Sequence, residues 1–399
     1  MRRGQQRVAV VGAGVVGLAV GRQLANTGHD VTVLDKEPDV AMHQSGHNSG
    51  VVHSGIYYTP GSLKATLCRR GVELIREFCA GHGLEYREIG KVVVARDDLE
   101  VARLRELEHR AKANGVPRAR WLDAGALHEL EPNVRGIAAL HSPTAAIVDF
   151  RAIARALADE ITAAGGAVRL STAVTGVEPV GDTATLHAGG EALRFDRVVL
   201  CAGLQSDVLA RAAGDEPGPA IVPFRGEYYR LRPERSGIVR GLVYPVPDPA
   251  YPFLGVHVTP RVDGTVDVGP NAVLATAREG YRRRDVNLRE LRDILRWPGA
   301  RRLIRQHWRA GVREMRGSLS KRAYLSLVRA YVPGLVRADL VRAPAGVRAQ
   351  AVDADGTLVD DFRISHLGPV IAVRNAPSPG ATSCLAIAEH VADHVVGRT

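Results

Sequence analysis

The segment RVAVVGAGVVGLAVGRQLANTGHDVTVLD, residues 7–35, constrains the fold of this chain more than any other feature. It opens with a short apolar run rich in β-branched residues, Arg7–Val11, which predicts a buried parallel strand. A glycine-rich turn follows, and apolar residues then recur at helical spacing through Leu24, until Gly28 is placed to end a helix. A second strand is predicted over Asp30–Leu34. Strand, turn, helix and strand in this order predict a Rossmann-type α/β unit.

The three glycines of the turn each have a physical role in binding a dinucleotide, which an ordinary glycine-rich turn would not require. Gly12 permits the tight turn, Gly14 lets the backbone approach a pyrophosphate, and Gly17 lets the helix pack close to the strand. The helix N-terminus presents N–H groups to the phosphate charge. Asp35 lies roughly 20 residues beyond the first glycine, where an acid binds ribose hydroxyls and disfavours the 2′-phosphate of NADP. FAD and NAD enzymes share this fingerprint, and its position at the start of the chain favours FAD. The predicted cofactor contacts here are Gly12, Gly14, Val15, Val16, Gly17, Asp35 and Lys36.

Directly after this unit, the stretch HQSGHNSGVVHSG places His43, His47 and His53 among glycine, serine and small apolar residues. A metal site would need convergent ligands on a rigid element, usually together with carboxylates or cysteines. The serines and glycines disfavour a helix, and the nearest acids, Glu37 and Asp39, lie near the ribose-binding end. Small residues instead let a backbone lie against an isoalloxazine ring, so we expect a flavin contact and no metal. The predicted cofactor contacts here are His43, Gln44, Ser45, Asn48, Ser49, Gly50 and Val51.

Longer motifs carry a resemblance to a known family. The stretch HQSGHNSGVVHSGIYYTPGSLKATLCRRG is very similar to the corresponding segment of L-2-hydroxyglutarate oxidases and dehydrogenases, which are FAD enzymes of the D-amino-acid-oxidase-like superfamily. The similarity continues in order along nearly the whole chain and is weakest from about Glu279 to Tyr331. It departs from the family pattern at Ala343, the first residue of one motif. The other matching motifs are IVDFRAIARALADE from Ile147, VVLCAGLQSD from Val198, IVPFRGEYY from Ile221, YPVPDPAYPFLGVHVTPRVDG from Tyr244, VGPNAVLATAREGY from Val268, APAGVRAQAVDADGTLVDDF from Ala343 and VRNAPSPGATSCLAIAEHVAD from Val373.

The resemblance implies a Rossmann-type FAD-binding domain of the α/β class, interleaved with an α+β substrate domain built on a mixed or antiparallel sheet. We expect the FAD-binding domain to comprise residues 1–90, 147–215 and 340–399. The substrate-binding domain is expected to comprise the two insertions, residues 91–146 and 216–339.

The second insertion and the last motif give further expectations. Alternating β-branched segments at residues 228–231, 253–258 and 265–268 predict antiparallel strands, and the arginine-rich stretch Arg282–Arg316 predicts helix with a solvated face. By the resemblance, a helix that starts near Thr382 points its N–H groups at the flavin N1/C2 carbonyl, where negative charge accumulates on reduction. The further predicted cofactor contacts are Val174, Ala202, Gly203, Ser378, Gly380, Ala381 and Thr382.

The activity that the resemblance implies is oxidation of L-2-hydroxyglutarate to 2-oxoglutarate, with hydride transfer from Cα to flavin N5. The protein then has to bind the carboxylates, orient the Cα–H bond and remove the hydroxyl proton. Removal of this proton suits histidine, because its ordinary pKa is near neutral. His53 is the first candidate for this base, and His257 is its rival. Arg348 is the leading carboxylate clamp, with an ion pair to a loop acid such as Asp353 as the alternative. The substrate contacts predicted are Tyr57, Tyr58, Arg225, Tyr244 and Arg348.

Several alternatives stay open at the level of sequence. One is oxidation of another 2-hydroxy acid or of an amino acid, and another is a flavin-binding protein without turnover. The electron acceptor is O₂ or a quinone, and nothing in the sequence predicts the oligomeric state. We expect FAD to be bound without a covalent link.

Charge and cysteine content bear on partners and compartment. Lys+Arg 53 exceeds Asp+Glu 43, which gives a net charge of +10, yet the aromatic content is 5% and no zinc-finger or RNA-recognition signature occurs. This balance predicts a solvated arginine-rich surface, with weak attraction to an anionic membrane as the alternative, and no nucleic-acid partner. No apolar run is long enough to span a bilayer, and the N-terminal MRRGQQ does not resemble a signal peptide. We expect a cytoplasmic protein with peripheral contact at the inner face of the cell membrane. The cysteines expected to be reduced and mostly buried are Cys68, Cys79, Cys201 and Cys384.

Overall fold

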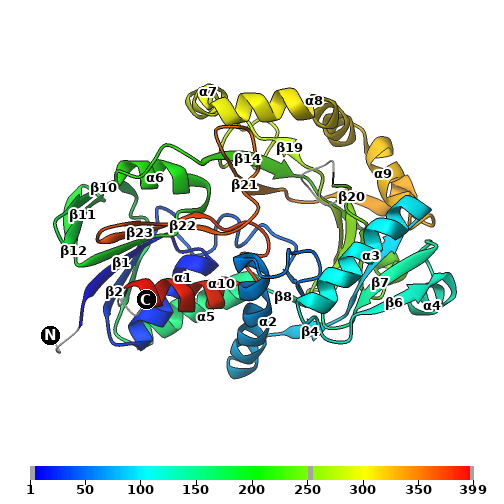
Figure 1. Cartoon of the computed structure of the whole chain (residues 1–399), viewed down its shortest axis with the longest axis horizontal. Coiled ribbons are helices and arrows are strands. Elements are labelled where there is room, and N and C mark those ends of the chain that lie inside the picture. The colour runs from blue at the N-terminus through cyan, green and yellow to red at the C-terminus, as the bar shows by residue number, and fades with distance from the viewer. Residues whose placement is uncertain (1–4, 250–254, 396–399) are drawn as a thin grey trace.

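The computed structural model of the chain describes residues 5–249 and 255–395. Figure 1 shows two main β-sheets, one at the left and one at the right of the view, with helices packed on them, one smaller sheet at the far left and the other smaller sheets between them. The N-terminal and C-terminal parts of the chain both belong to the left-hand half.

The first main sheet has six strands, and its pairings are parallel except at one edge. Its first two strands in the sequence, residues 7–11 and 30–34, have the predicted bounds. In order across the sheet, the strands are β22 (Arg363–Leu367), β23 (Val370–Asn375), β13 (Arg197–Leu200), β1 (Arg7–Val11), β2 (Asp30–Leu34) and β9 (Ala167–Arg169).

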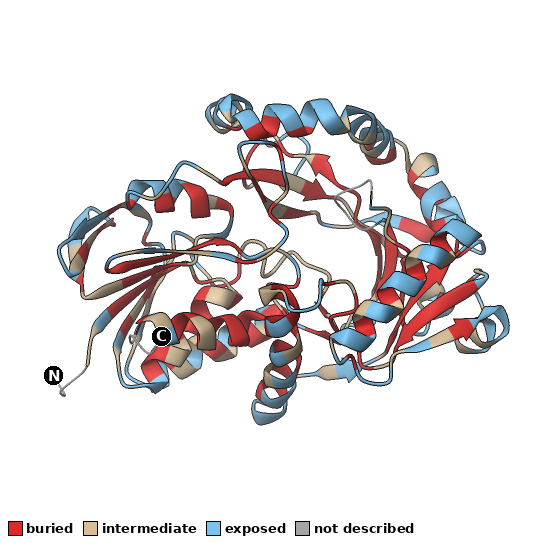
Figure 2. Ribbon diagram, viewed as in Figure 1, coloured by how far each residue is buried: buried red, intermediate tan, exposed pale blue. Residues whose placement is uncertain are grey.

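Both faces of this sheet are covered, as the buried strands in Figure 2 show. Val8 and Val10 pack with helices in one apolar core, and Ala9 and Val11 pack in a second core against a small antiparallel sheet. Burial on both faces explains why β1 is a continuous apolar run. The helices of the first core are α1 (Val15–Asn26), α2 (Leu63–Gly81), α5 (Phe150–Ala163) and α10 (Cys384–Val395), and the other face carries α6 (Ser206–Ala212), β10 (Val174–Val180), β11 (Thr183–Ala188) and β12 (Glu191–Phe195).

The second main sheet has eight strands and is mixed, because one interior pair is parallel while the other pairs are antiparallel. Val92 and Val94 face one apolar core, and Val93 and Ala95 face another. In order across the sheet, the strands are β20 (Leu340–Arg342), β15 (Tyr229–Leu231), β18 (Val266–Gly269), β17 (His257–Pro260), β16 (Leu242–Pro245), β5 (Lys91–Ala95), β7 (Ala138–Ser142) and β6 (Arg120–Asp123), with α3 (Asp98–Ala113), α4 (Ala124–Leu130) and α9 (Lys321–Arg329) packed on them.

Two three-stranded sheets connect the main sheets. One lies beneath two long helices at the top of Figure 1, where Val222, Ile294 and Leu303 share a small apolar core. It consists of β19 (Val273–Leu274), β14 (Ala220–Gly226) and β21 (Gly346–Val352), under α7 (Leu288–Arg296) and α8 (Pro298–Leu319). The other consists of β3 (Val51–Val52), β8 (Ala146–Val148) and β4 (Tyr86–Glu88), and short 3-10 helices are η1 (Gly203–Gln205), η2 (Pro233–Ile238) and η3 (Arg337–Asp339).

The expected elements of the second insertion are recovered with shifted bounds. The prediction for residues 253–258 lies partly outside the described residues, and the strand there begins at His257. The arginine-rich stretch forms two helices instead of one, and the second reaches Leu319. Pro298 opens the second helix because the first helical position needs no backbone N–H.

The interleaved arrangement is visible in the sheet order, since the six-stranded sheet draws only on residues 1–90, 147–215 and 340–399. β20 and β21 also fall in the last of these segments, but they pair with β15 and β14. The division into two domains stays a prediction. The four cysteines are free, and all but Cys201 are buried, as the sequence analysis predicts.

Candidate active site

A cavity of about 1110 Å³ lies outside the carboxyl ends of the six-stranded sheet and reaches the eight-stranded sheet. Residues that end or follow β1, β2 and β13 line one part of it, and residues of β16 and β17 line another. In open α/β sheets, ligands bind in the crevice at these strand ends. All of the predicted site residues line the cavity except Gly50 and Arg225.

Gly50 and Arg225 have structural positions outside the cavity lining, and their contacts with cofactor and substrate stay predictions. Gly50 has a φ of +70°, and a Cβ on it would lie 2.7 Å from the carbonyl oxygen of Val148, so glycine there allows close strand pairing. Arg225 is buried, and its guanidinium lies 3.4 Å from the carboxylate of Glu227 and donates to the carbonyl of Arg282 over 3.3 Å.

The dinucleotide turn has the geometry that its glycines predict. Gly12 has a φ of +112°, and a Cβ on it would lie 2.4 Å from the carbonyl oxygen of Cys201. A Cβ on Gly17 would lie 1.9 Å from the carbonyl oxygen of Gly12, so α1 could not approach β1 with a larger residue there. Gly14 is the N-cap of α1 and provides no side-chain cap. This cradle, with the helix N-terminus at its base, fits the pyrophosphate of a dinucleotide.

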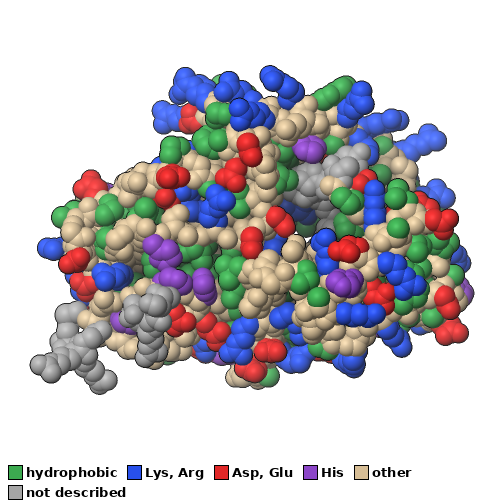
Figure 3. All heavy atoms as spheres, in the orientation of Figure 1, with side chains coloured by type: hydrophobic (Ala, Val, Ile, Leu, Met, Phe, Trp, Pro, Cys, Tyr) green, Lys and Arg blue, Asp and Glu red, His purple; other side chains and the backbone are tan. Residues whose placement is uncertain are grey.

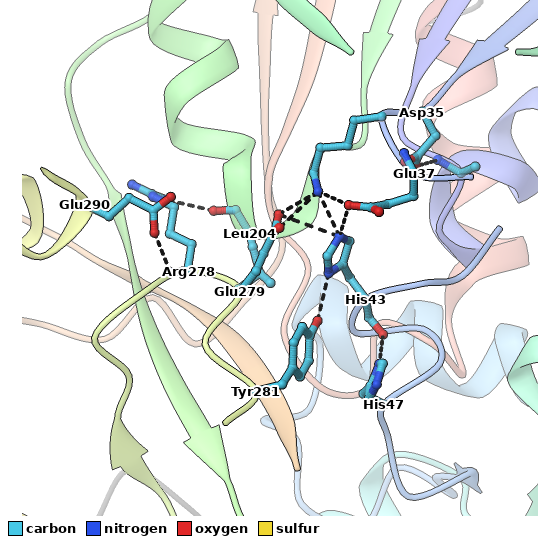
Figure 4. A network of polar contacts seen from close by, with 11 residues as sticks. Asp35, Glu37, His43, His47, Leu204, Arg278, Glu279, Tyr281 and Glu290 are labelled. Carbon is cyan, nitrogen blue, oxygen red and sulfur yellow. Dashed lines mark hydrogen bonds and ion pairs between the residues drawn. The ribbon is translucent and has the colours of Figure 1, made fainter. Parts of the chain in front are cut away.

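The ribose end of the cavity is a polar network, drawn in Figure 4. The carboxylate of Asp35 accepts hydrogen bonds from the backbone N–H groups of Ala13, over 2.6 Å, and Glu37, over 2.9 Å. Lys36 Nζ forms ion pairs with Glu37 and, over 3.0 Å, with Glu279. Burial alone would lower the pKa of Lys36, but its hydrogen bonds to Glu37 and Glu279 raise it, so the amine keeps its charge.

The same network contains the one group of potential metal ligands found among the described residues. One ligand atom each from Glu37, His43 and Glu279 lies within 4.8 Å of the other two. Lys36 Nζ also lies 3.0 Å from His43 Nε2, so an ammonium group takes the place that a cation would occupy between these ligands. The expectation of no metal site stays a prediction, and the arrangement gives a reason for it.

The loop after β2 is held by its own side chains. Asn48 donates to the carbonyls of Gln44, over 3.1 Å, and Ser45, over 2.7 Å. Gln44 Oε1 accepts from the backbone N–H of Ala349, over 2.9 Å, which ties the loop to β21. His47 packs against the ring of Tyr281, with 4.5 Å between ring centroids. Ser49 takes part in none of these contacts, and it lines the cavity.

His53 also lines the cavity and is fixed on several sides. Its backbone N–H donates to Thr382 Oγ1 over 3.0 Å, and its carbonyl accepts from Cys68 Sγ over 3.2 Å. Its ring lies between two polar atoms, with Nε2 3.5 Å from Ser378 Oγ and Nδ1 3.4 Å from Lys91 Nζ. Burial first, and then the charge of Lys91, holds the pKa of His53 well below its ordinary value. The imidazole is therefore neutral at neutral pH and has a lone pair for a proton.

His257 has a more constrained position. Its ring stacks on Tyr244, with ring centroids 3.9 Å apart, and its Nδ1 lies 2.9 Å from the carbonyl oxygen of Gly255. Burial lowers the pKa of His257 to about 3.

Cations and phenols complete this end of the cavity. Arg348 lines the cavity from β21, and Asp353, the alternative partner considered for it, pairs with Arg363 over 3.1 Å. Lys64 also lines the cavity and forms a 2.8 Å ion pair with Asp360, whose side chain is 88% exposed. The buried hydroxyl of Tyr57 has no hydrogen-bond partner among the described residues. An unpartnered buried hydroxyl that faces a cavity is suited to a polar ligand.

The last motif brings the loop before α10 to the cavity. A Cβ on Gly380 would lie 2.6 Å from the carbonyl oxygen of Ala376, which explains the glycine in this tight turn. Thr382 also uses its hydroxyl to fix the backbone of His53, as described above, and α10 begins two residues later, at Cys384. Residues 376–382, which lead into this helix, line the cavity, and the contact of the helix N-terminus with the flavin stays a prediction.

Sequence reasoning missed four residues of the cavity and its wall. Glu279 and Tyr281 come from the end of a matching motif, and Lys64 comes from the middle of another. Lys91 opens the apolar strand KVVVA, and a charged residue next to such a run is the signal that could have identified it.

Comparison with known proteins defines the class of this oxidoreductase. The chain belongs to the FAD dependent oxidoreductase family, DAO, whose model matches residues 7–394. It is similar to the L-2-hydroxyglutarate dehydrogenase of Escherichia coli (strain K12), with 45% identity over 390 residues, 97% of this chain and 92% of that protein. It is also similar to the mitochondrial L-2-hydroxyglutarate dehydrogenase of Homo sapiens, with 42% identity over 410 residues, 98% of this chain and 89% of that protein.

Solved structures match over the whole chain at lower identity. The FAD-bound L-alpha-glycerophosphate oxidase of Mycoplasma pneumoniae superposes with a TM-score of 0.80 at 22% identity, covering 98% of this chain and 94% of that chain. Glycine oxidase of Geobacillus kaustophilus superposes with a TM-score of 0.73 at 20% identity, covering 99% of this chain and 96% of that chain. These matches and the family confirm the predicted fold class, the family resemblance and FAD as the cofactor.

Proposed function

We propose that this FAD-dependent oxidoreductase oxidises L-2-hydroxyglutarate to 2-oxoglutarate. The observation that carries the proposal is the 45% identity, over 97% of this chain, to a protein named L-2-hydroxyglutarate dehydrogenase. The cavity supports the reaction type, since it combines the dinucleotide turn with a neutral histidine and two cationic side chains. FAD, when bound, supplies the acceptor for the hydride that leaves Cα.

His53 is the residue we assign as the base that removes the hydroxyl proton. Its Nε2 lies beside Ser378 on the cavity surface, and its depressed pKa keeps the lone pair available at neutral pH. His257 is the weaker candidate, because its ring is stacked on Tyr244 and its Nδ1 is engaged by the carbonyl oxygen of Gly255.

Two cations are assigned to the two carboxylates of the substrate. Arg348 offers a guanidinium, which binds a carboxylate through two parallel hydrogen bonds. Lys64 offers a buried ammonium group, and the side chain of its partner Asp360 is exposed. A substrate carboxylate could therefore replace Asp360 at Lys64, because the displaced Asp360 carboxylate stays hydrated. The hydroxyl of Tyr57 supplies a further hydrogen bond.

FAD is proposed to bind without a covalent link. The glycine turn would hold the pyrophosphate, Asp35 the ribose, and the loops around Ser45 and Gly380 the isoalloxazine ring. Acid precipitation should release all of the yellow colour into the supernatant, and a coloured pellet would contradict this assignment. We also propose that residues 1–90, 147–215 and 340–399 form the FAD-binding domain, and residues 91–146 and 216–339 the substrate-binding domain.

The direct test of the function is anaerobic bleaching of the purified yellow protein by L-2-hydroxyglutarate, with the D enantiomer as the control. Bleaching by the L form alone, with 2-oxoglutarate formed, is the expected result. L-Lactate, L-malate and glutamate extend the comparison to other hydroxy acids and amino acids. A flavin that dithionite reduces but neither enantiomer bleaches would remove the substrate assignment and leave the fold and cofactor.

We further propose a cytoplasmic location with peripheral contact to an anionic membrane. In residues 5–249 and 255–395, no helix is both long and apolar enough to cross a bilayer. Trp308, Val312, Met315 and Leu319 nevertheless follow one another on one face of α8 and are 57%, 61%, 44% and 68% exposed. We call these four residues the α8 apolar stripe.

Charge around the α8 apolar stripe complements an anionic surface. Arg309, Arg313 and Arg316 flank it on the same helix, where Glu314 is the one acid. Figure 3 shows Lys and Arg side chains gathered along the upper rim, over α7 and α8. A helix that carries Trp and aliphatic residues on one face and arginines beside them is suited to the interface of a membrane. Whether O₂ or a membrane quinone accepts the electrons would be decided by comparing reoxidation rates with each.

A further inference from the structure

Lys91 is a buried lysine in the wall behind the candidate base. It is the first residue of β5 and is 1% exposed, and its Nζ lies 3.4 Å from Nδ1 of His53. Within the described part of the chain, no carboxylate forms an ion pair with this amine. Lysine is almost never fully buried unless it is paired, so the position needs an explanation.

Aromatic rings, in place of anions, surround the Lys91 amine. Nζ lies 4.1 Å from the ring centroid of Tyr244 and 5.3 Å from that of Tyr57. Burial lowers the pKa of Lys91 to about 7, and Cys68 opposes this only in part. The amine therefore exchanges between its charged and neutral forms near neutral pH. The titratable groups that face Lys91 and His53 are Tyr57 from the loop after β3, Lys64 and Cys68 from α2, Tyr244 from β16 and His257 from β17.

The two ring nitrogens of His53 have different neighbours, and only the neighbour of Nε2 lines the cavity. Nε2 lies beside Ser378 Oγ, while Nδ1 faces Lys91. A neutral imidazole carries one hydrogen, so Nε2 accepts the substrate proton only when that hydrogen is on Nδ1. The group beside Nδ1 then has to accept a hydrogen bond, which a neutral amine does through its lone pair.

We propose that Lys91 is a positioning residue that, as a neutral amine, accepts the Nδ1 hydrogen of His53 and so directs the Nε2 lone pair into the cavity. This inference rests on the proposed function, in which His53 removes the hydroxyl proton of the substrate. As the substrate O–H bond breaks and the Nε2–H bond forms, the Nδ1 proton passes to Nζ. The imidazole ends neutral and Lys91 ends as an ammonium group. The electron pair of the O–H bond stays on the substrate oxygen and forms the C=O bond as hydride leaves Cα.

The charged form of Lys91 has the opposite effect on His53. An ammonium group has three donors and no acceptor, so it donates to Nδ1 and leaves the imidazole hydrogen on Nε2. His53 then presents a donor to the cavity and cannot take the substrate proton. The rate of substrate oxidation is therefore expected to follow the neutral fraction of Lys91, and to rise with pH through the pKa of this residue.

The kinetic test measures anaerobic flavin bleaching by L-2-hydroxyglutarate in the FAD-loaded protein, from about pH 5.5 to about pH 9.5. The unmodified protein should show a rise near pH 7 and then a plateau. Lys91→Met should lose the rise and lie about 10–100-fold below the plateau. Lys91→Arg, which stays charged, should be slow at every pH. Lys112→Met, at a lysine of α3 whose side chain is 70% exposed, should keep the unmodified profile. A Lys91→Met protein with the unmodified rise and plateau would overturn the inference.

A second test needs no substrate and separates this inference from the proposed function. The chain has five lysines, so ¹³C labelling at lysine Cε gives a simple NMR spectrum in which Lys91→Met, or Lys91→Gln if the first variant fails to fold, identifies the Lys91 signal. We expect that signal to titrate near pH 7 and to shift its midpoint in His53→Gln. A Lys91 signal that stays charged to about pH 10 overturns the inference, even if the substrate bleaches the flavin. Absence of bleaching together with a Lys91 midpoint near 7 that responds to His53→Gln would instead reject the proposed function alone.

Discussion

At the scale of single residues, the two histidines His53 and His257 of the cavity differ in what holds their rings. His53 leaves Nε2 at the cavity surface, whereas His257 is stacked on Tyr244 with Nδ1 engaged by a backbone carbonyl. We therefore expect His53→Gln to lower the rate of anaerobic flavin bleaching by about 10²–10⁴-fold, the usual contribution of a general base. His257→Gln should cost much less, and both variants should keep their flavin absorbance. A larger loss in His257→Gln than in His53→Gln would exchange the two roles.

The two cations can be distinguished by removing one substrate charge. Lys64→Met and Arg348→Met should each raise KM for L-2-hydroxyglutarate by roughly 10–100-fold, since a hydrogen bond to a charged group contributes about 1.5–3 kcal/mol. The 5-methyl ester of the substrate lacks one carboxylate charge and should bind the unmodified protein weakly. If Lys64 binds that carboxylate, the preference for the diacid over the ester disappears in Lys64→Met and persists in Arg348→Met. The reverse pattern would assign Lys64 to the other carboxylate, and an unchanged preference in both variants would contradict the assignment.

The buried amine of Lys91 also predicts how stability changes with pH. Its pKa is about 7 in the folded protein against an ordinary value of 10.5, so between these two pH values the unfolded chain holds one proton more than the folded chain. Stability of the unmodified protein should thus rise with pH across this window, with a contribution of about 1.4 kcal/mol per pH unit from this group. Lys91→Met lacks this pH-dependent contribution to the free energy of unfolding. Its thermal unfolding temperature should exceed that of the unmodified protein most at and below pH 7, and the difference should shrink towards pH 10.

Lys112→Met is the matched control for this measurement, because it removes an exposed lysine that pairs with Glu108 over 3.1 Å. Calorimetric scans of the three proteins at several pH values check the prediction. A temperature difference between Lys91→Met and the unmodified protein that is the same at every pH would mean that Lys91 does not titrate in this window.

At the scale of secondary-structure elements, local patterns were sufficient for the dinucleotide unit. The strands at residues 7–11 and 30–34 have the predicted bounds, because a strand buried on both faces shows itself as an apolar run between glycines and polar residues. Lys91 and Lys64 were not predicted, since their approach to His53 depends on where the tertiary fold places β5 and α2. Arg225 shows the same limit, for its segment was identified while the direction of its side chain depends on Glu227 and Arg282.

The α8 helix allows an element-scale prediction about membranes. Trp308 and Val312 of the α8 apolar stripe are exposed, and burial of such side chains contributes about 1.5–3 kcal/mol each when it is complete. The double variant Trp308→Ser, Val312→Ser should therefore bind vesicles of phosphatidylglycerol and phosphatidylcholine at least about tenfold more weakly in co-sedimentation. Binding should also fall with added salt, because the arginines beside the stripe are screened.

Leu99→Ser supplies the matched control for the membrane experiment. Leu99 is 62% exposed on α3, so this variant removes exposed apolar surface from another helix. Vesicle binding of this variant should equal that of the unmodified protein. Equal binding by the α8 double variant, or no vesicle binding by any of the proteins at low salt, would contradict peripheral contact through α8.

At the scale of the whole molecule, the cavity is built from segments that are far apart in the sequence, and a buried ion pair links two of them. Arg278 donates to both carboxylate oxygens of Asp207, over 2.6 Å and 3.0 Å, and the two side chains are 6% and 1% exposed. Arg278 also donates to the carbonyl of Leu204, over 2.6 Å, next to the cavity. The segment before β14 and the segment after β19 are therefore joined through one guanidinium.

Removal of this guanidinium should destabilise the molecule as a whole. Arg278→Met leaves Asp207 buried without its bidentate partner, and loss of one member of a buried pair costs about 3–5 kcal/mol. Arg211 provides the matched control, because it binds the same carboxylate over 3.3 Å from a side chain that is 38% exposed, and exposed pairs contribute about 0–1 kcal/mol. Urea unfolding of both variants should give a large loss for Arg278→Met and a small one for Arg211→Met. Since Leu204 lies at the cavity wall, Arg278→Met should also lose FAD at lower urea than Arg211→Met. Equal losses in the two variants would mean that the join between the segments depends on apolar contacts and not on this ion pair.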